Sequence, residues 1–200
     1  MMIIGIVPTI RCPYKNQIEI SFDKRLINFL ETLNKRFTIR LLNESSKINK
    51  NFKLIVFSGG NDLLRFNNTQ ENKFRDKIDN LLFMQAKNLK IPMLGICYGA
   101  TYIANKFDAK FKVKKKVGNH KIAFLKNNFF NNNSKIIEVN SFKNYSIKSV
   151  NKKIEILALD KDNTIEAFFV KKMNFLGLMW HPERYKKFRK IDFDLIKNLI

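Results

Sequence analysis

A cysteine between two glycines is the first feature of this sequence that could do chemistry. It lies in Gly95-Ile96-Cys97-Tyr98-Gly99, after an apolar run at residues 93–96 and before a helical pattern at 100–107. A nucleophile at such a strand-to-helix turn has a strained backbone, and the flanking glycines relieve the crowding. The helix start favours a thiolate and offers backbone N–H groups to an oxyanion. The segment predicts a nucleophilic Cys97, although a buried cysteine that only packs is the alternative for this motif alone.

A histidine and a carboxylate form the second feature, in Trp180-His181-Pro182-Glu183. The segment follows an apolar run at residues 175–179, and a rigid proline separates the two side chains, so both can point to one side of an extended chain. A histidine can take the proton of a thiol while a carboxylate orients its ring. Alone, the pair could be a surface ion pair. Together with Cys97 it predicts a catalytic base, His181, oriented by Glu183.

A glycine-rich loop, Phe57-Ser58-Gly59-Gly60-Asn61-Asp62, follows another apolar run. Two adjacent glycines can simply make a tight turn. They also let the backbone approach a ligand and donate N–H groups to it. Open α/β sheets bind ligands outside the carboxyl ends of their strands. We therefore expect Gly59 and Gly60 to contact the substrate in the same crevice as Cys97.

The elements that must position these residues alternate between strands and helices through the first half. Apolar runs predict strands at residues 3–7, 38–42, 54–57 and 93–96. Helical spacing of apolar residues predicts helices at 21–34, with Ser21 as N-cap, and at 72–88 and 100–107. This order predicts an α/β fold with an open, mostly parallel central sheet flanked by helices.

Short strands dominate the second half. We expect strands at residues 121–125, 135–140, 155–159, 165–170 and 175–179, a loop at 126–133, a turn at 160–163 and a last helix from about residue 191. No Pro- or Gly-rich linker divides the chain, so residues 1–200 are expected to form a single domain with a strand-rich extension.

Composition excludes several classes of protein. A hydrophobic content of 45% excludes disorder, and no apolar run approaches the roughly 18 residues of a membrane span. The apolar start lacks the basic flank of a signal peptide, and two cysteines give no disulfide framework, which favours the cytoplasm. No Cys/His cluster has metal-ligand spacing, so we expect no metal.

The net charge of +21, from 38 Lys and Arg against 17 Asp and Glu, is the outlying number. Such an excess suits nucleic acid, a membrane surface or a phosphorylated ligand. Only 8 of these cations are Arg, the bidentate reader of phosphates, and Asn, Phe and Ile are also abundant. We therefore attribute most of the net charge to the codon composition of an AT-rich genome. The lysines at residues 114–116 are expected to form a solvated turn rather than a nucleic-acid-binding patch. Cys12 and His120 are expected to pack rather than react.

Five segments, in their order along the chain, resemble the class I glutamine amidotransferases and in particular their free-standing γ-glutamyl hydrolase-like branch. They are the three segments described above together with Val139-Asn140-Ser141-Phe142 and Ile165-Glu166-Ala167-Phe168. The resemblance covers essentially the whole chain. It implies the flavodoxin-like fold of that family and a cysteine-dependent hydrolase that needs no cofactor.

The resemblance also implies a role for each matching residue. Cys97 would attack the δ-carbonyl of a γ-glutamyl group. His181 would act as the base and then as the acid for the leaving amine, with Glu183 orienting it. The backbone N–H groups of Gly60 and Tyr98 would form the oxyanion hole.

Substrate contacts follow from the same resemblance. Three neighbouring residues would hold the glutamyl amino and carboxylate groups through their backbone, namely Asn140, Ser141 and Phe142. Two positions depart from the family: Thr101 stands where a Gln often reads the glutamyl head, and Lys143 stands where a His is common. Hydrolysis is therefore better determined than the identity of the substrate.

Hydrolases of γ-glutamyl-CDP-amidate in capsule phosphoramidate synthesis are similar to this chain in size and Lys/Asn-rich composition. The similarity implies a small-molecule, nucleotide-linked substrate and no nucleic acid, membrane or obligatory synthetase partner. Arg11, Lys143 and Arg184 are candidates to reach its phosphates, unless they are solvated surface cations. Two other functions stay open: a glutaminase that supplies ammonia to a separate synthetase, and a basic nucleic-acid-binding protein on an inactive hydrolase fold.

Overall fold

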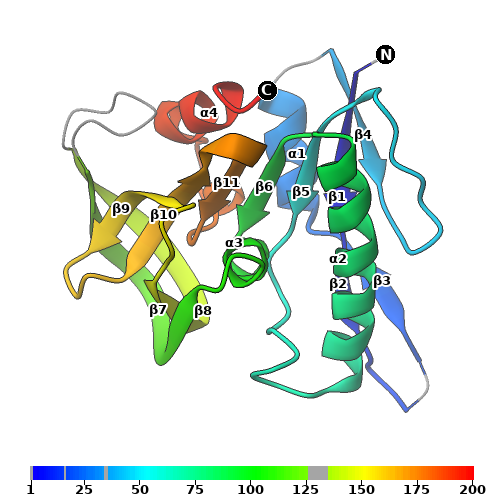
Figure 1. Ribbon diagram of the computed structural model, residues 1–200, viewed down its shortest axis with the longest axis horizontal. Coiled ribbons are helices and arrows are strands. Elements are labelled where there is room, and N and C mark those ends of the chain that lie inside the picture. Colours follow the sequence, from blue (N-terminus) through cyan, green and yellow to red (C-terminus); the bar gives the residue numbers. More distant parts are fainter. Residues whose placement is uncertain (1, 16, 34–35, 126–134) are drawn as a thin grey trace.

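The computed structural model describes residues 2–15, 17–33, 36–125 and 135–200. Within them, the main sheet has nine strands in the order β4-β1-β5-β6-β11-β10-β8-β7-β9, and β2 pairs with β3 in a separate ribbon (Figure 1). The elements of the first half are β1 (Met2–Val7), β2 (Thr9–Arg11), β3 (Glu19–Ser21), α1 (Lys24–Leu33), β4 (Phe37–Leu41), β5 (Phe52–Phe57), α2 (Gln70–Asn88), β6 (Met93–Ile96) and α3 (Tyr98–Asn105). Those of the second half are β7 (Lys110–Phe124), β8 (Ile136–Ser149), β9 (Glu155–Asp160), β10 (Ile165–Val170), β11 (Phe175–Leu178) and α4 (Lys190–Lys197), with 3-10 turns at Lys171–Met173 and Pro182–Arg184.

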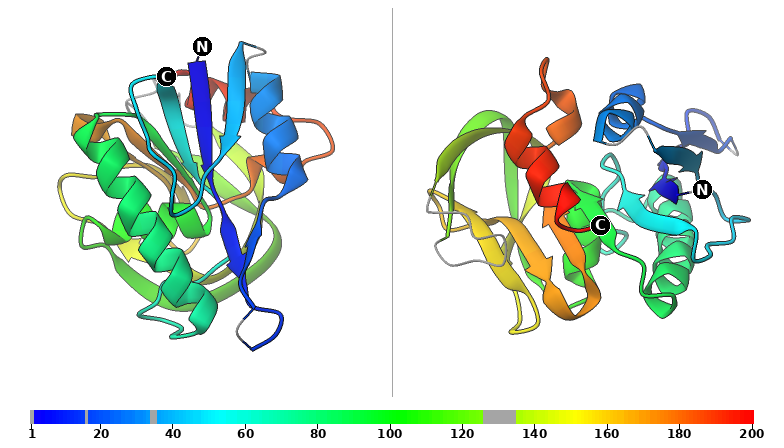
Figure 2. Two further views of the ribbon diagram at one scale, coloured as in Figure 1. Left: turned by 90° about the vertical axis from the view of Figure 1, so that its right-hand side faces the viewer. Right: turned by 90° about the horizontal axis from the view of Figure 1, so that it is seen from above.

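The strands β4, β1, β5, β6 and β11 run parallel to one another. The four inner strands are apolar on both faces, whereas the edge strand β4 exposes Thr38 and Arg40: in β1, Ile3 belongs to one hydrophobic core, and Ile4 and Ile6 belong to the other. Helices α2 and α3 cover the first core, and α1 and α4 cover the second, so that α2 and α1 lie on opposite sides of the strands (Figure 2). This confirms the predicted open α/β sheet, because strands buried on both faces need helices on both.

The parallel half brings the predicted chemistry to one edge. β5, β6 and β11 lie side by side, and their carboxyl ends lead directly into Ser58, Cys97 and Met179. Because parallel strands end at the same edge, the glycine-rich loop, the cysteine turn and the histidine segment meet there.

A closed ring of four antiparallel strands forms the second half. β10 and β7 each pair with both β8 and β9, and β10 also pairs with β11, which joins the ring to the parallel strands (left side of Figure 1). The strands β7 and β8 are much longer than the predicted strands at 121–125 and 135–140. In the first part of β7, exposed and half-buried residues alternate, many of them lysines, so no apolar run marks that part as a strand.

The start of α1 differs from the prediction. Ser21 ends β3 rather than capping the helix, which begins at Lys24. Asp23 provides the polar group there instead, since its carboxylate accepts a hydrogen bond from the Arg25 N–H at 2.9 Å. The ribbon of β2 and β3 was also not predicted, because its strands have only three residues each.

Residues 114–116 are not a solvated turn. They lie within β7, where Lys114 and Lys116 form ion pairs with the buried carboxylate of Asp160. The remaining predicted strands and helices are confirmed within a few residues, whereas the loop expected at 126–133 lies outside the described residues. No helix in the described part of the chain is long and apolar enough to cross a membrane.

Candidate active site

Cys97 occupies the sharp turn between β6 and α3. Its backbone φ is 52°, in the left-handed region that residues other than glycine rarely adopt. A Cβ atom on Gly95 would lie 2.5 Å from the backbone nitrogen of Ala100, and one on Gly99 would lie 2.0 Å from the carbonyl oxygen of Phe57. Only glycine fits at these two positions, so the local sequence allows the strained turn that presents the thiol at the sheet edge.

His181 faces Cys97 and is held from behind by Glu183. The Nδ1 atom of His181 lies 2.6 Å from Oε1 of Glu183, and the Cys97 side chain hydrogen-bonds with the same ring. The His181 and Glu183 side chains are only 2% and 4% exposed. Burial favours the neutral ring, but attraction and hydrogen bonding to Cys97 and Glu183 outweigh it and raise the pKa of His181 to about 9. At neutral pH the ring therefore holds a proton that it can donate to a leaving group.

Asn140 holds the backbone of His181 rather than a substrate. Its Oδ1 accepts a hydrogen bond from the His181 N–H, and its Nδ2 donates to the His181 carbonyl, both at 2.8 Å. The Asn140 N–H donates to the hydroxyl of Tyr185 at 3.0 Å. Ser141 is fully buried and, like Asn140, does not line the cavity beside the thiol. Of the three residues expected to bind substrate through their backbone, Phe142 alone lines that cavity, and its carbonyl accepts a hydrogen bond from the thiol at 3.7 Å.

The glycine-rich loop lies against both Cys97 and His181. A Cβ atom on Gly59 would lie 2.7 Å from the His181 ring and 3.5 Å from Cβ of Cys97. Gly60 has a φ of 118°, and a Cβ there would lie 2.6 Å from the side chain of Thr9. The Thr9 hydroxyl donates a hydrogen bond to the Gly59 carbonyl at 2.7 Å, which fixes the loop. The close contacts at Gly59 and Gly60 leave no space for a side chain, so the backbone of the loop itself lies beside the thiol and the ring.

A buried polar cluster beneath this loop was not predicted from the sequence. Arg75 and Asp79, one turn apart on α2, form a fully buried ion pair at 2.8 Å. The Arg75 guanidinium also donates to the Ser58 carbonyl at 3.0 Å and lies 4.6 Å from the centre of the Tyr98 ring, whose hydroxyl donates to Asp79 at 2.7 Å. The cluster therefore ties the glycine-rich loop to the residue that follows Cys97. The sequence signal that could have predicted this ion pair is the spacing of Arg75 and Asp79, which are four residues apart on a predicted helix.

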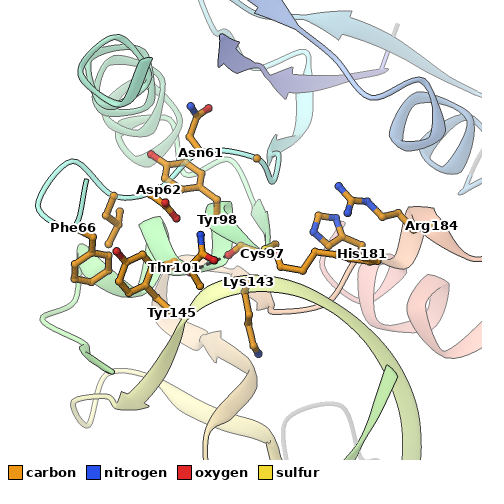
Figure 3. Close-up of a pocket in the computed structure, with 14 residues that line it drawn as sticks. Asn61, Asp62, Phe66, Cys97, Tyr98, Thr101, Lys143, Tyr145, His181 and Arg184 are labelled. Atoms are coloured by element: carbon orange, nitrogen blue, oxygen red, sulfur yellow. Dashed lines mark hydrogen bonds between the residues drawn. The ribbon is translucent and has the colours of Figure 1, made fainter. Parts of the chain in front are cut away.

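A cavity of about 240 Å³ opens beside Cys97, which lies near its centre in Figure 3. The rings of Phe66 and Tyr145 stack at 4.2 Å on the side away from the catalytic histidine. Thr101 also lines the cavity, but its hydroxyl donates to the Cys97 carbonyl at 3.1 Å, so it supports the turn as well as the wall. Asp62 adds a carboxylate. The wall of the cavity thus combines aromatic rings, a hydroxyl group and a carboxylate.

Lys143 does not offer its charge to this cavity. Its Nζ lies 2.6 and 2.7 Å from the two oxygens of the fully buried Glu166, and Figure 3 shows the side chain running away from Cys97. Burial lowers the pKa of Lys143, and attraction to Glu166 opposes that effect. The expectation that Lys143 reaches a phosphate is therefore wrong, because its ammonium group compensates a buried carboxylate. His120, which was expected to pack, lies 3.4 Å from the same carboxylate.

Arg184 and Arg11 border the site on the other side of His181. A second cavity of about 440 Å³ is lined by both arginines and shares His181 and Gly60 with the first cavity. The Arg184 guanidinium lies 4.8 Å from the centre of the Phe142 ring, so an aromatic face holds it beside the catalytic residues (Figure 3). The described residues contain no group of three or more His, Cys, Asp or Glu side chains placed to hold a metal ion.

The comparisons with known proteins identify the family of this chain. The model of the family "Glutamine amidotransferase class-I" matches residues 17–193, so the chain belongs to the class I glutamine amidotransferases. It is a glutamine-amidotransferase-like hydrolase of carbon–nitrogen bonds. A Thermoplasma acidophilum protein, described as a subunit of GMP synthase, has the same fold, with a TM-score of 0.73 and 20% identity over 100% of this chain and 92% of its own. A Thermotoga maritima glutamine amidotransferase gives a TM-score of 0.66 at 15% identity, over 91% of this chain and 76% of its own.

Two curated relatives are more informative about chemistry. A gamma-glutamyl-CDP-amidate hydrolase of Campylobacter jejuni subsp. jejuni serotype O:2 is 36% identical over 151 residues, which cover 72% of each chain. A glutamine-hydrolyzing GMP synthase of Wigglesworthia glossinidia brevipalpis is 33% identical over 108 residues, which cover 48% of this chain and 21% of the synthase.

Proposed function

We propose that this chain hydrolyses a γ-glutamyl amide through a glutamyl thioester, with γ-glutamyl-CDP-amidate as its substrate in capsule phosphoramidate synthesis. It would act in the cytoplasm on this small molecule and need no synthetase partner. The observation that carries the proposal is the placement of His181 between the Cys97 thiol and the Glu183 carboxylate, at the mouth of a cavity. A protein that only binds needs none of these three groups.

The steps follow from this geometry. The Cys97 thiolate attacks the δ-carbonyl carbon, and the oxygen that gains negative charge is stabilised by the backbone N–H groups of Gly60 and Tyr98. His181 gives its proton to the leaving nitrogen, the carbon–nitrogen bond breaks, and the glutamyl group stays on sulfur. The neutral His181 then takes a proton from water, which attacks the thioester and releases glutamate and the thiolate.

The first cavity suits the glutamyl head. Asp62 offers a carboxylate to the α-amino group, and the Phe142 carbonyl at the cavity wall can accept a second hydrogen bond from it. Thr101 offers one hydroxyl where relatives often have an amide, so the head group is held by fewer side-chain hydrogen bonds. The group attached to the leaving nitrogen must therefore supply part of the binding free energy through contacts outside the first cavity.

The nucleotide part of the proposal rests on the Campylobacter relative and on the cations beside His181. That relative is 36% identical over 72% of both chains and is named for γ-glutamyl-CDP-amidate. Arg11 and Arg184 line the cavity on the leaving-group side of His181, where a phosphate attached to the leaving nitrogen would be. Both observations favour a phosphorylated leaving group over free glutamine.

Glutamate release from a panel of γ-glutamyl conjugates tests the proposal, with γ-glutamyl-CDP-amidate, γ-glutamyl anilide and glutamine compared by kcat/KM. We expect the nucleotide conjugate to be preferred and Cys97→Ala to abolish release. Cys12→Ala is the matched control, because Cys12 is the other free cysteine and lies outside the first cavity. Unchanged release by the Cys97→Ala protein would contradict the chemistry, and preference for glutamine would contradict the substrate.

A second candidate is a glutaminase that supplies ammonia to a separate synthetase. The similarity to part of the Wigglesworthia GMP synthase and the fold shared with the Thermoplasma protein favour it. This candidate predicts a stable synthetase partner that co-purifies with the chain and raises its activity on glutamine. Full activity of the isolated chain on the nucleotide conjugate would exclude it.

A further inference from the structure

A second cavity adjoins the first at His181. It holds about 440 Å³ and lies where the glycine-rich loop, the ribbon of β2 and β3, the start of α1 and the segment after β11 come together. Gly60, His181 and Arg184 line both cavities, so the two meet at the catalytic histidine. A substrate that reacts at Cys97 can therefore extend into both.

The direction of proton transfer decides which part of the substrate enters which cavity. The leaving nitrogen takes its proton from His181, so it must lie within hydrogen-bond reach of that ring. Cys97 lines only the first cavity, whereas Glu183, which contacts Nδ1 of the same ring, lines only the second. Whatever is attached to the leaving nitrogen therefore extends into the second cavity.

The charges around the second cavity are mostly positive. Its lining holds four cationic side chains and two carboxylates, namely Arg11, Lys24, Arg25 and Arg184 against Asp23 and Glu183. Both carboxylates are already engaged: Asp23 is paired with Arg25 at 2.8 Å, and Glu183 holds the catalytic ring at 2.6 Å. Among the described residues, Arg11 and Lys24 form no ion pair within 4.0 Å. The cavity thus has cationic groups that no carboxylate of the described chain neutralises.

Arg184 is the cation nearest the chemistry. Its guanidinium lies 4.8 Å from the centre of the Phe142 ring, and that ring packs edge-on against the His181 ring at 5.9 Å. The Arg184 Nε atom is buried, 3.7 Å from Glu183, and has no hydrogen-bond partner in the described chain. Its position is therefore set by packing against Phe142, and the side chain lines both cavities where they meet.

We propose that the second cavity is a leaving-group subsite that binds a diphosphate. Arg184 contacts the phosphate bonded to the leaving nitrogen, and Arg11 and Lys24 contact the phosphate beyond it. This assignment rests on the proposed hydrolysis of a nucleotide-linked γ-glutamyl amide. Only the carbon–nitrogen bond is cleaved, next to Cys97 and His181. The nitrogen–phosphorus bond stays intact, and the leaving group keeps it. Glutamine has nothing to place in this subsite, which gives the enzyme a physical reason to discriminate against it.

Calorimetric titration of the full chain with cytidine diphosphate and with inorganic pyrophosphate tests the subsite directly. Arg11→Gln and Lys24→Gln each remove one charge-assisted contact, so we expect each to weaken binding about 10-fold. Lys53→Gln is the control, because Lys53 lies near the amino end of β5, away from the edge that carries the loop. Binding of both ligands should also weaken as salt rises. Absence of binding, or equal affinities in all four proteins, would overturn the subsite.

A kinetic arm separates this inference from the proposed function. We expect Arg11→Gln and Lys24→Gln to lower the ratio of kcat/KM for γ-glutamyl-CDP-amidate over γ-glutamyl anilide by about 10-fold each. An unchanged ratio in a protein that hydrolyses the nucleotide conjugate would remove the subsite and keep the function. Cytidine diphosphate binding that depends on Arg11 and Lys24, in a protein that does not hydrolyse the conjugate, would remove the function and keep the subsite.

Discussion

Replacing Glu183 by Gln tests the electrostatic part of the catalytic arrangement while keeping its shape. In the wild-type chain the Glu183 Oε1 atom lies 2.6 Å from Nδ1 of His181, and both side chains are almost fully buried. The Gln side chain can still accept the Nδ1–H hydrogen bond, but it no longer places a negative charge beside the protonated ring. The substitution therefore isolates the contribution of that charge.

The size of the effect follows from the hydrogen bond. A buried hydrogen bond to a charged partner stabilises by roughly 1.5–3 kcal/mol, and a neutral one by roughly 0.5–1.5 kcal/mol. The difference of about 1.4 kcal/mol corresponds to about one pKa unit. Since the pKa of His181 is raised to about 9 in the wild type, we expect about 8 in the Glu183→Gln protein. The proton needed by the leaving nitrogen is then lost at lower pH.

The assay is kcat/KM for glutamate release measured from pH 6 to about pH 10.5. The alkaline limb reports loss of the His181 proton and should move from about pH 9 to about pH 8. Asp194→Asn removes a carboxylate from the exposed face of α4 and should leave the limb in place. An alkaline limb that stays near pH 9 in Glu183→Gln would refute the reasoning, because Glu183 would then not support the charged ring.

Three further substitutions test the supports of the site. Tyr98→Phe removes a 2.7 Å hydrogen bond to the buried Asp79 and should lower the free energy of unfolding by about 1–3 kcal/mol in urea titrations; an unchanged midpoint would show that the cluster does not brace the loop. Asn140→Ala removes two 2.8 Å hydrogen bonds to the backbone of the catalytic histidine, so steady-state kinetics should show a larger fall in kcat than rise in KM; a change in KM alone would instead indicate substrate binding by Asn140. Lys143→Met removes the nearest cation from the buried Glu166, with His120 at 3.4 Å and Lys116 at 4.0 Å still beside it, and should cost about 3 kcal/mol of stability at pH 7, with partial recovery at acidic pH as the carboxyl takes a proton; an unchanged stability with a raised KM for the nucleotide conjugate would restore the phosphate role.

The turn around Cys97 could be predicted because its sequence pattern is local. The left-handed backbone of Cys97 is flanked by glycines at 95 and 99, and the contact that requires Gly95 comes from Ala100 in the helix that the turn opens. The spacing of strand, cysteine turn and helix is therefore visible in a short window, whereas the contact that requires Gly99 comes from Phe57 in a distant strand. A short window also shows the segment of His181 and Glu183, which are only two residues apart.

Lys143 shows where prediction from sequence ended. It lies two residues after Ser141, next to the predicted substrate segment, and its charge suggested a phosphate. The direction of its side chain depends on β8, and the carboxylate that it neutralises belongs to Glu166 on β10, 23 residues away. Asn140 is similar, because the backbone that it clamps lies 41 residues further along the chain. Neither partner can be inferred from a neighbourhood in sequence.

The sequence was enough to predict the family, the parallel sheet and the meeting of Cys97, His181 and Glu183 at one edge of it, whereas their catalytic roles stay a prediction. These follow from patterns of a few residues, since backbone conformation and hydrophobic periodicity are set locally. Which charges are available to a ligand depends instead on the folded arrangement. Of the 38 Lys and Arg residues, Lys143 forms an ion pair with a buried carboxylate. In contrast, Arg11, Lys24 and Arg184 come from separate segments and line one cavity. A charge acts through space and is cancelled by whatever lies within a few ångströms, and those distances exist only in the folded chain.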